Sequence, residues 1–531
     1  MNLHTHGLHV TPDGDGDNVL REIWPAGTPE SYSAYCGTGP DYFFIGSNNY
    51  RYNFLPGHPV GSYWYHPHKH GSTTFQVANG MAGALIVEDG QHNLFTIFDI
   101  EQKRYQSAFE KIVIIQQVAL YPPEPPSVVA PTDLPDGYAY VNALELYGLT
   151  NDEFPGQDKS STQEANASSS PATVLTVNGQ YVPTITMGSE EIQAWRMINT
   201  SWTEDTILTW SFGSTQDANG DQPIAYAIGT DGNPLPASII GRQVDQLSSP
   251  TKGELDTLAP GQRVDLLVQA PAIQAGQSNA YTLSVTRQGP NGPETDPLLY
   301  IIVNGDPNTN TTDGYKPPTV MPERTAFTVL PRPEPVPINV GTLDPRFDPA
   351  TLGDDQQPIC FSFLPVGQSA INGASFNPAG PQRTLHLNKT SIWSVAGQQA
   401  PHIFHIHVNP FVLLARIAES GDDVTHDLYP HSISAEGDQF LLDGIFRDTL
   451  LIHPHKATTD AMCGLPDSVW DEPGTIFASY QRDFCGNYVM HCHVLEHEDT
   501  GMMEWVQVVN DQGEICPDPT SSACQPSGMP T

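Results

Sequence analysis

Short apolar runs rich in β-branched residues recur along the whole chain and limit what it can fold into. They are bounded by Gly, Pro, Asn or Asp, and they read GALIVEDG, KIVIIQQVAL, ATVLTVNG, QRVDLLVQA, PLLYIIVNG, HIFHIHVNPFVLLARI and TLLIHPH. Runs with this composition and these boundaries are typical of strands. No long stretch shows the periodicity and caps of a helix. The sequence therefore predicts an all-β protein, built from sandwiches with Greek-key connections.

Three blocks can be separated along the 531 residues, a length that suits two to four domains. Residues 1–105 end after GMAGALIVEDG and a polar patch, and residues 106–305 are interrupted by loops rich in Pro and Ser. A Pro-rich connector then leads into the last block, 306–531. Segments 177–199 and 371–395 share an Asn-Gly opening and a later Trp, which indicates a modest internal repeat.

The charge of the chain excludes two classes of partner. Lys and Arg number 22 against 60 Asp and Glu, so the formal net charge is −38. This balance argues against binding to nucleic acid or to anionic membrane surfaces. It would attract cations, metal ions included, although solubility is the simpler explanation. No apolar run approaches the length of a transmembrane helix.

The cysteines indicate an oxidising compartment. Seven are present, so at least one is unpaired, and Cys492 stands out because histidines flank it. The other six allow three disulfides in any of fifteen connectivities; they are Cys36, Cys360, Cys463, Cys485, Cys516 and Cys524. Four N-x-S/T sequons, at Asn166, Asn199, Asn310 and Asn388, are compatible with export. We therefore expect a secreted or periplasmic protein, although no signal peptide is visible in this chain.

Four histidine pairs of the form H-x-H carry the strongest functional signal. Two lie in the first block and two in the last: His4 and His6, His66 and His68, His405 and His407, His491 and His493. Residues i and i+2 of a strand point to the same face, so each pair can direct two imidazoles at one point. Imidazole suits copper, zinc, iron and nickel. The four pairs predict eight ligands of a multinuclear metal centre.

Strand alternation also explains the position of Cys492. If the two flanking histidines face one way, Cys492 faces the other, and one strand serves two metal sites. A His₂Cys site with a weak axial Met is typical of blue copper. Cys492 would supply the thiolate, His497 follows five residues later, and Met502 fits the axial position better than Met503. The second histidine would be His402, in the motif H-x-x-H-x-H.

These motifs closely resemble those of three-domain multicopper oxidases of the laccase and bilirubin-oxidase type. The resemblance covers most of the chain, through LHTHGL, WYHPHKHG, GMAGALIVE, LAPGQRVDLLV and HCHVLEHEDTGMM. It implies three cupredoxin-like Greek-key domains at 1–105, 106–305 and 306–531, the middle one without copper ligands. Members of this family usually carry strands before the first motif. We therefore expect an N-terminally truncated first domain, with His4 on a frayed terminus.

Carried over position by position, the resemblance implies four copper ions. The type 1 copper would be held by His402, Cys492, His497 and Met502. The type 2 copper would be held by His4 and His405. The two type 3 ions would each take one triplet, and which ion takes which is open: His6, His66 and His493, or His68, His407 and His491.

The resemblance also implies a mechanism. A reducing substrate would give single electrons to the type 1 copper, and these would pass through Cys492 to the trinuclear cluster, where four electrons reduce dioxygen to water. Four protons are consumed, so an acid relay is needed. Glu498 matches the proton-donating carboxylate of the family. Asp15 or Asp17, in TPDGDGDN, matches the acidic position after the first motif.

The remaining histidines are expected to bind no metal. His70 is predicted to support the site or the fold, and His453 and His455 belong to an ordinary strand-to-loop region. The others lack paired spacing and are interpreted as surface or satisfied structural residues: His9, His58, His92, His386, His426 and His431.

The leading interpretation is a monomeric oxidase of phenolic or related small-molecule donors, with dioxygen as acceptor. A metal oxidase acting on Fe(II), Cu(I) or Mn(II) is a second possibility, and it would need carboxylates near His402 or His497. A non-catalytic copper-binding protein is a third. A copper-containing nitrite reductase shares the domain type, but four H-x-H pairs in one chain favour the oxidase.

Overall fold

The structure is a computed structural model. It describes residues 1–35, 38, 42–121, 139–140, 172–214, 220–247, 253–289, 292–305, 315–338, 356–364, 368–420, 423–428, 432–436, 439–455 and 474–515. Strands dominate this part of the chain, which confirms the all-β prediction. Several predictions concern residues outside the described ranges: those on Cys36, Cys463, Cys516, Cys524, Asn166, Asn310 and His431.

The first block is built on one three-stranded antiparallel sheet. Its order is β1 (His4–His6), β4 (Gly61–His66) and β5 (Gly83–Val87), and a parallel pair, β2 (Glu22–Trp24) and β3 (Phe43–Ile45), lies outside it. Its helices are η1 (Glu30–Tyr35), α1 (Thr73–Ala78), α2 (Leu94–Ile97) and α3 (Gln102–Phe109). His4 pairs with His66 across β1 and β4 and is only 1% exposed. The expectation that His4 lies on a frayed terminus is therefore wrong.

The middle block contains two larger sheets. The first runs β13 (Asn233–Pro234), β12 (Ile224–Thr230), β15 (Arg263–Gln269), β10 (Ile192–Asn199), β6 (Glu110–Tyr121) and β7 (Ala139–Tyr140), with β8 (Ala172–Val177) beside β6. The second runs β14 (Thr257–Leu258), β11 (Leu208–Ser214), β16 (Ser278–Gly289), β17 (Gly292–Asn304) and β9 (Thr184–Gly188). Short helices accompany them: η4 (Glu204–Thr206), η5 (Val244–Gln246) and α5 (Gly253–Asp256). Helix η6 (Arg324–Val329) lies beyond this block, in the Pro-rich connector, and its Phe327 packs into the core of the middle block.

Burial along two of these strands follows their positions in the sheets. Every residue of β10 is buried, because neighbours flank it on both sides and both of its faces are covered. In β16, by contrast, buried and partly exposed residues alternate through the middle of the strand, which shows that one of its faces meets solvent.

The last block also contains two main sheets. One runs β20 (Ser369–Ile371), β19 (Gln356–Phe363), β22 (Thr390–Gln398), β31 (Gly474–Tyr480), β24 (Phe411–Ser420) and β25 (Asp423–Leu428), with β28 (Phe446–Arg447) and β30 (Pro454–His455) beside it. The other runs β21 (Arg383–His386), β33 (Met503–Val509), β32 (Gly486–Cys492), β23 (His402–Ile406) and β29 (Thr449–Ile452). A small sheet joins β18 (Val336–Ile338), β27 (Gln439–Asp443) and β26 (Ser432–Glu436), and helix α6 (Leu495–Asp499) follows β32.

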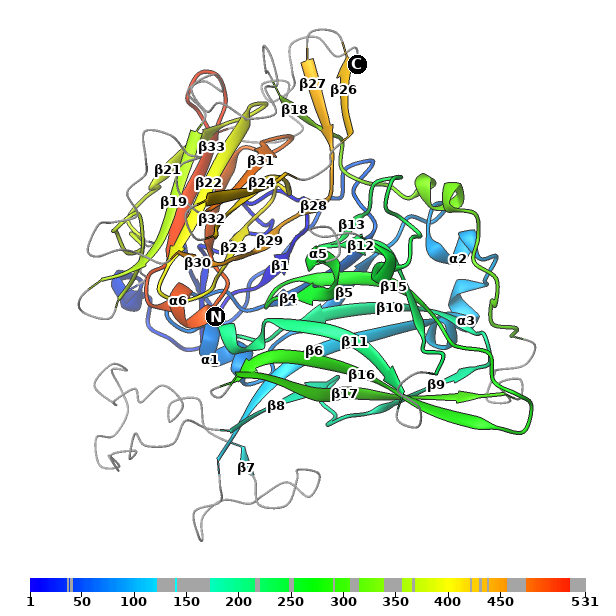
Figure 1. The fold of residues 1–531 in the computed structure, drawn as a ribbon. Helices are drawn as coiled ribbons and strands as arrows, with labels where there is room; N and C mark the ends of the chain where they lie inside the picture. Colours follow the sequence, from blue (N-terminus) through cyan, green and yellow to red (C-terminus); the bar gives the residue numbers. More distant parts are fainter. Residues whose placement is uncertain are drawn as a thin grey trace.

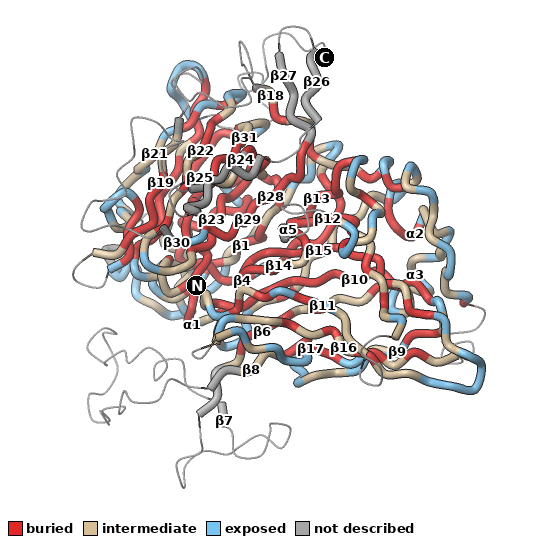
Figure 2. The backbone as a smooth tube through the Cα atoms, viewed as in Figure 1, coloured by how far each residue is buried: buried red, intermediate tan, exposed pale blue. Residues whose placement is uncertain are grey.

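The first block lies between the other two. In Figure 1 the dark-blue β1 sits at the centre, between the yellow-to-red strands of the last block and the cyan-to-green strands of the middle block. Val60 and Phe95 join the apolar core of the middle block, whereas Val19 and Leu20 pack against Trp505 of the last block. Figure 2 shows that the strands meeting here are largely buried. This arrangement brings strands from both ends of the chain together; the predicted domain boundaries at 105 and 305 stay predictions.

Candidate metal centre

The four H-x-H pairs meet at the contact between the first and last blocks. The first two pairs lie on β1 and at the end of β4, and the other two on β23 and β32 or just beyond them. Each of the eight histidines is at most 2% exposed. β1 pairs with β4 and β23 pairs with β32, and Figure 1 shows the two pairs close to each other. Sequence positions about 400 residues apart thus form one cluster, as the motif pattern predicted.

Within this cluster the imidazoles fall into groups whose candidate ligand atoms lie within 4.8 Å of one another. The groups are His4, His6 and His405; His6, His66 and His493; His68, His407 and His491. The second and third groups have the same members as the triplets that the resemblance assigns to the type 3 ions. Binding of an ion by each group stays a prediction.

The donor chemistry of the cluster fits metal ions. Seven of its eight histidines carry at least one buried ring nitrogen without a hydrogen-bond partner: His4 Nε2, His6 Nδ1, His66 Nε2, His68 Nδ1, His405 Nε2, and both nitrogens of His407 and His493. A buried polar atom without a partner is costly. So many of them in one cluster indicate an arrangement that a metal would complete.

Burial also keeps these imidazoles in the form that binds metal. Desolvation holds the pKa of seven of them well below the usual value, and neighbouring histidines lower it further: His4, His6, His68, His405, His407, His491 and His493. The same cause lowers the pKa of His66 to about 3. All eight are therefore neutral near pH 7, with a lone pair available for a metal.

The structure separates the two aspartates that the sequence left equivalent. Asp17 is 4% exposed, and its Oδ2 lies 2.7 Å from His4 Nδ1 while its Oδ1 accepts from Thr5 N at 2.8 Å. Burial raises the pKa of Asp17 to about 7. The side chain of Asp15 is 64% exposed and pairs with Arg21 instead. Of these two aspartates, only Asp17 contacts the histidine cluster.

A second, smaller site lies on the other face of β32. Cys492 is a buried free thiol, and its Sγ lies 3.7 Å from His402 Nδ1 and 3.6 Å from His497 Nδ1. Burial raises the pKa of this thiol to about 12. Met502 is fully buried, and its backbone bonds to Cys492 and His497. The structure brings this predicted quartet together; the axial role of Met502 stays a prediction.

The two sites differ in their access to solvent. His402 and Cys492 are fully buried, but His497 is only partly buried, with the ring of Phe363 packed against it at 4.9 Å. The His497 edge is therefore the part of the Cys492 site that lies nearest to solvent. The eight-histidine cluster offers no comparably exposed imidazole.

Glu498 lies between the two sites, on helix α6. It is fully buried, with Oε1 3.4 Å from His68 Nδ1 and Oε2 3.2 Å from His491 Nδ1. His491 Nδ1 itself is 3.0 Å from the carbonyl oxygen of Cys492, the shorter contact. Thr73 Oγ1 donates to Glu498 Oε1 at 3.1 Å. Burial raises the pKa of Glu498 well above its usual value, so the carboxyl is poised to carry a proton.

Carboxylates also gather beside the Cys492 site. Burial, and then the charges of Glu204, Asp205 and Asp499, raise the pKa of Glu496 to about 7. Glu204 lies close enough to Cys492 to raise the pKa of its thiol. Acidic side chains of helix η4 in the middle block and of helix α6 in the last block thus act electrostatically on one another and on Cys492.

The sequence interpretation missed several residues that surround the eight-histidine cluster. His6 Nε2 lies 3.1 Å from Asp448 Oδ1 and 3.0 Å from Thr449 Oγ1, and Arg263 holds Asp448. A Cβ at Gly261 would lie 3.1 Å from His6 Cε1, so the backbone of the middle block packs directly on the cluster. The motif LAPGQRVDLLV contains two of these residues, but nothing in its spacing points to histidines elsewhere in the chain.

Among the residues that the structure describes, the histidines that were expected to bind no metal take part in none of these groups, and their lack of metal stays a prediction. His70 hydrogen-bonds to the backbone of Glu498, which fits the predicted supporting role. His9 bridges Val408 O and Asp483, and His58 contacts Pro59 O, as expected of satisfied structural histidines. The side chains of His426 and His455 lie outside the described part of the structure.

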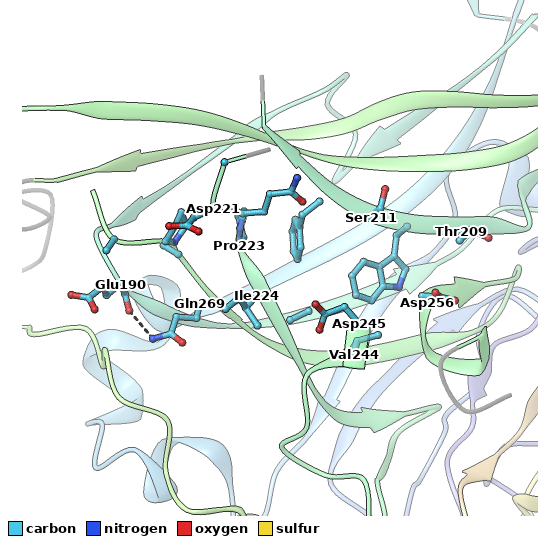
Figure 3. Close-up of a pocket in the computed structure, with 18 residues that line it drawn as sticks. Glu190, Thr209, Ser211, Asp221, Pro223, Ile224, Val244, Asp245, Asp256 and Gln269 are labelled. Atoms are coloured by element: carbon cyan, nitrogen blue, oxygen red, sulfur yellow. Dashed lines mark hydrogen bonds between the residues drawn. The ribbon is translucent and has the colours of Figure 1, made fainter. Parts of the chain in front are cut away.

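A separate cavity lies in the middle block (Figure 3). Its volume is about 790 Å³, and Trp210, Phe212 and several carboxylates line it, among them Glu190, Asp221 and Asp245. No histidine or cysteine is among its described lining residues. This cavity is therefore separate from the two histidine sites.

Family models of multicopper oxidases match two stretches of the chain, residues 40–92 and 466–512. The chain is 24% identical over 530 residues to a protein named laccase from Bacillus subtilis (strain 168), across 96% of this chain and 79% of that protein. It is 22% identical over 518 residues to a protein named multicopper oxidase mco from Staphylococcus haemolyticus (strain JCSC1435), across 96% and 76%.

Solved structures show the same fold. The McoA multicopper oxidase from the hyperthermophile Aquifex aeolicus matches with a TM-score of 0.55 and 17% identity, over 95% of this chain and 84% of that chain. A multicopper oxidase from Campylobacter jejuni, described as a metallo-oxidase, matches with a TM-score of 0.53 and 19% identity, over 96% and 80%. These likenesses confirm the predicted class of cupredoxin-like β domains.

Proposed function

Because the chain belongs to the multicopper oxidase family and is an oxidoreductase, we propose that it takes single electrons from a phenolic or similar donor and reduces dioxygen to water. The observation that carries this proposal is the meeting of all four H-x-H pairs in one buried cluster, with Cys492 on the opposite face of the same strand. Copper is the family's metal, and the unpartnered imidazole nitrogens fit it.

We assign four copper ions to these residues. The type 1 ion would be held by His402, Cys492, His497 and Met502. The type 2 ion would be held by His4 and His405, and the type 3 ions by the triplets His6, His66, His493 and His68, His407, His491. When bound, copper supplies one-electron transfer at the first site and four-electron reduction of dioxygen at the second.

Three residues of the chain have further roles in the proposed reaction. Cys492 is bonded through its backbone to His491 and His493, so it provides a covalent path between the two sites. The electron donor would approach the type 1 site at His497, which is only partly buried. Glu498, in contact with His68 and His491, supplies protons to the reduced oxygen.

Dioxygen uptake tests the proposal. Copper-loaded protein should consume dioxygen when a phenolic donor is added, and protein stripped of copper should not. Cys492→Ser should lose both the blue absorption and the uptake, because the thiolate is its source. A blue, fully copper-loaded sample that consumes no dioxygen with any donor would refute the oxidase and favour a copper-binding protein without turnover.

A second candidate function has one specific observation in its favour. A metal oxidase needs carboxylates near the type 1 site. The charges of Glu204 and Asp205 act on Glu496, the sequence neighbour of His497, and Glu204 also acts on the Cys492 thiol. Carboxylate oxygens suit Mn(II) and also occur among the ligands of Fe(II). For a metal oxidase, Glu204→Gln combined with Glu496→Gln should raise KM for Fe(II) and leave the KM for a phenol unchanged. Glu190→Gln, an exposed site in the middle block, is the control. An unchanged KM for Fe(II) would exclude this candidate.

We further propose a monomer that works outside the cytosol on small donors. The described helices are all too short or too polar to cross a bilayer. The strongly acidic composition argues against nucleic acid as a partner. Sedimentation of the copper-loaded protein and fractionation of cells that express its full gene would test these two points.

A further inference from the structure

We propose that Arg263, from the block that supplies no candidate ligand, is a positioning residue of the eight-histidine centre. Acting through Asp448, it fixes the tautomer and orientation of His6 and His405. The inference rests on the proposed function, because it concerns how the same copper centre is held.

The hydrogen bonds of His6 and His405 show what Asp448 does. His6 Nε2 meets Asp448 Oδ1 at 3.1 Å, so this nitrogen carries the proton and Nδ1 is left as the ligand atom. His405 Nδ1 meets the backbone oxygen of Asp448 at 2.8 Å, which leaves Nε2 free. The two rings stack with centroids 3.8 Å apart. One residue thus sets the ligand atoms of two adjacent histidines, a control known to strengthen metal binding.

Asp448 is in turn held by Arg263. Nη1 donates to Asp448 Oδ1 at 2.7 Å and Nη2 to Oδ2 at 2.6 Å, a bidentate pair in which both side chains are almost completely buried. Two further guanidinium donors are used as well: Nε donates to Ser62 O and Nη1 to Gly261 O, both at 3.0 Å. Because every hydrogen bond has a fixed direction, the guanidinium cannot turn without breaking several of them.

The surrounding backbone also restrains this pair. Asp231, in the tight turn between β12 and β13, accepts from Arg263 N at 3.0 Å and from Asp448 N at 3.3 Å. Gly7 has φ +89°, and a Cβ there would overlap both Arg263 and Asp448. The first, middle and last blocks all contribute to this network. It places Asp448 relative to His6 even though the two are 442 residues apart.

A purely structural ion pair would explain the same contacts, so the test needs a matched pair elsewhere. Arg196 is also a buried arginine of the middle block, and it bonds Glu110 at 2.9 Å and Asp265 at 3.0 Å. Neither of its carboxylates bonds a candidate copper ligand in the described structure. Arg263→Lys and Arg196→Lys both retain the charge and lose the planar fork.

The experiment compares copper-loaded wild-type protein with these two variants. The blue absorption reports the type 1 copper, electron paramagnetic resonance reports the type 2 copper, and competition with a chelator reports how firmly the latter is held. For Arg263→Lys we expect about 10- to 100-fold weaker retention of the type 2 copper and an altered resonance signal. The blue band should be unchanged, and Arg196→Lys should match wild type in all three measurements.

Asp448→Asn serves as a second variant if Arg263→Lys does not fold, because it keeps the size of the side chain and removes the charge. A wild-type resonance signal and wild-type chelator resistance in the variants that fold would overturn the inference. So would an equal loss in Arg196→Lys. Wild-type protein that is blue but has no type 2 signal would overturn the proposed function itself, and this inference with it.

Discussion

At the scale of single residues, the alternation of side chains along β32 directs neighbouring residues into two different sites. Cys492 faces His402 and His497, and its two histidine neighbours face the other cluster. Spacing alone could predict this, because residues i and i+2 share a face in any strand. Asp448 and Arg263 could not be predicted in the same way, since their contact with His6 depends on how three blocks pack.

Glu498 provides the first test at this scale. Glu498→Gln keeps the size of the side chain and the contact with Thr73 but cannot release a proton. We expect dioxygen reduction to slow by about 10²- to 10⁴-fold, because a positioned general acid contributes that much. Turnover is measured by dioxygen uptake, and the blue absorption should persist. Loss of the blue band as well would mean that Glu498 has a structural role instead.

Asp17 and Asp15 form a matched pair for a second test. Asp17→Asn removes the charge that faces His4 Nδ1 at 2.7 Å, and it should weaken retention of the type 2 copper by about 10-fold or more. Asp15→Asn, at an exposed site, should leave it unchanged. Retention of the type 2 copper in both variants is measured by electron paramagnetic resonance while a chelator competes for the metal. Equal behaviour of the two variants would contradict the role of Asp17.

At the scale of elements, the sequence predicts the strands well and the short helices poorly. The strands repeat an obvious composition, whereas α1 and α6 are six and five residues long and depend on each other. Ser72, the residue before α1, makes no capping bond, and Asp499 of α6 accepts from Thr73 N at 3.1 Å and Thr74 N at 2.8 Å instead. A cap supplied from 425 residues away leaves no local signal.

This distant cap yields a prediction for stability. Asp499→Ala should lower the free energy of unfolding by about 1 kcal/mol, the usual value of a helix N-cap. Chemical denaturation of the copper-loaded protein measures the change. Glu101→Ala is the control, because Glu101 precedes α3 and makes no capping bond. Equal losses from both variants would show that Asp499 does not cap α1.

At the scale of the whole molecule, metal ligands join segments that are far apart in the sequence. The first block has a small core of its own, formed by Leu8, Val10 and Tyr63 together with partly buried neighbours. It relies on the other blocks for much of its packing. The sequence could predict that both ends of the chain supply ligands. It could not predict that residues of the middle block, Gly261 and Arg263, would pack against the histidine cluster and its partner Asp448.

Copper removal tests this dependence. Ions bound only by the folded protein stabilise it by about 4 kcal/mol when free metal exceeds Kd about 1,000-fold. Calorimetry should therefore show a lower Tm after chelation. Recovery of the original Tm when copper is restored is the control for irreversible damage. An identical Tm with and without copper would mean that the ions do not hold the first and last blocks together.

The central claim is that the eight-histidine cluster reduces dioxygen completely, with electrons that enter at Cys492. The most direct measurement is the stoichiometry of donor oxidised to dioxygen consumed, with peroxide assayed in the same sample. Four one-electron donors and four protons per dioxygen, two waters and no peroxide are the predicted result. A ratio of two with one peroxide per dioxygen, or no uptake by blue, copper-loaded protein, would contradict it.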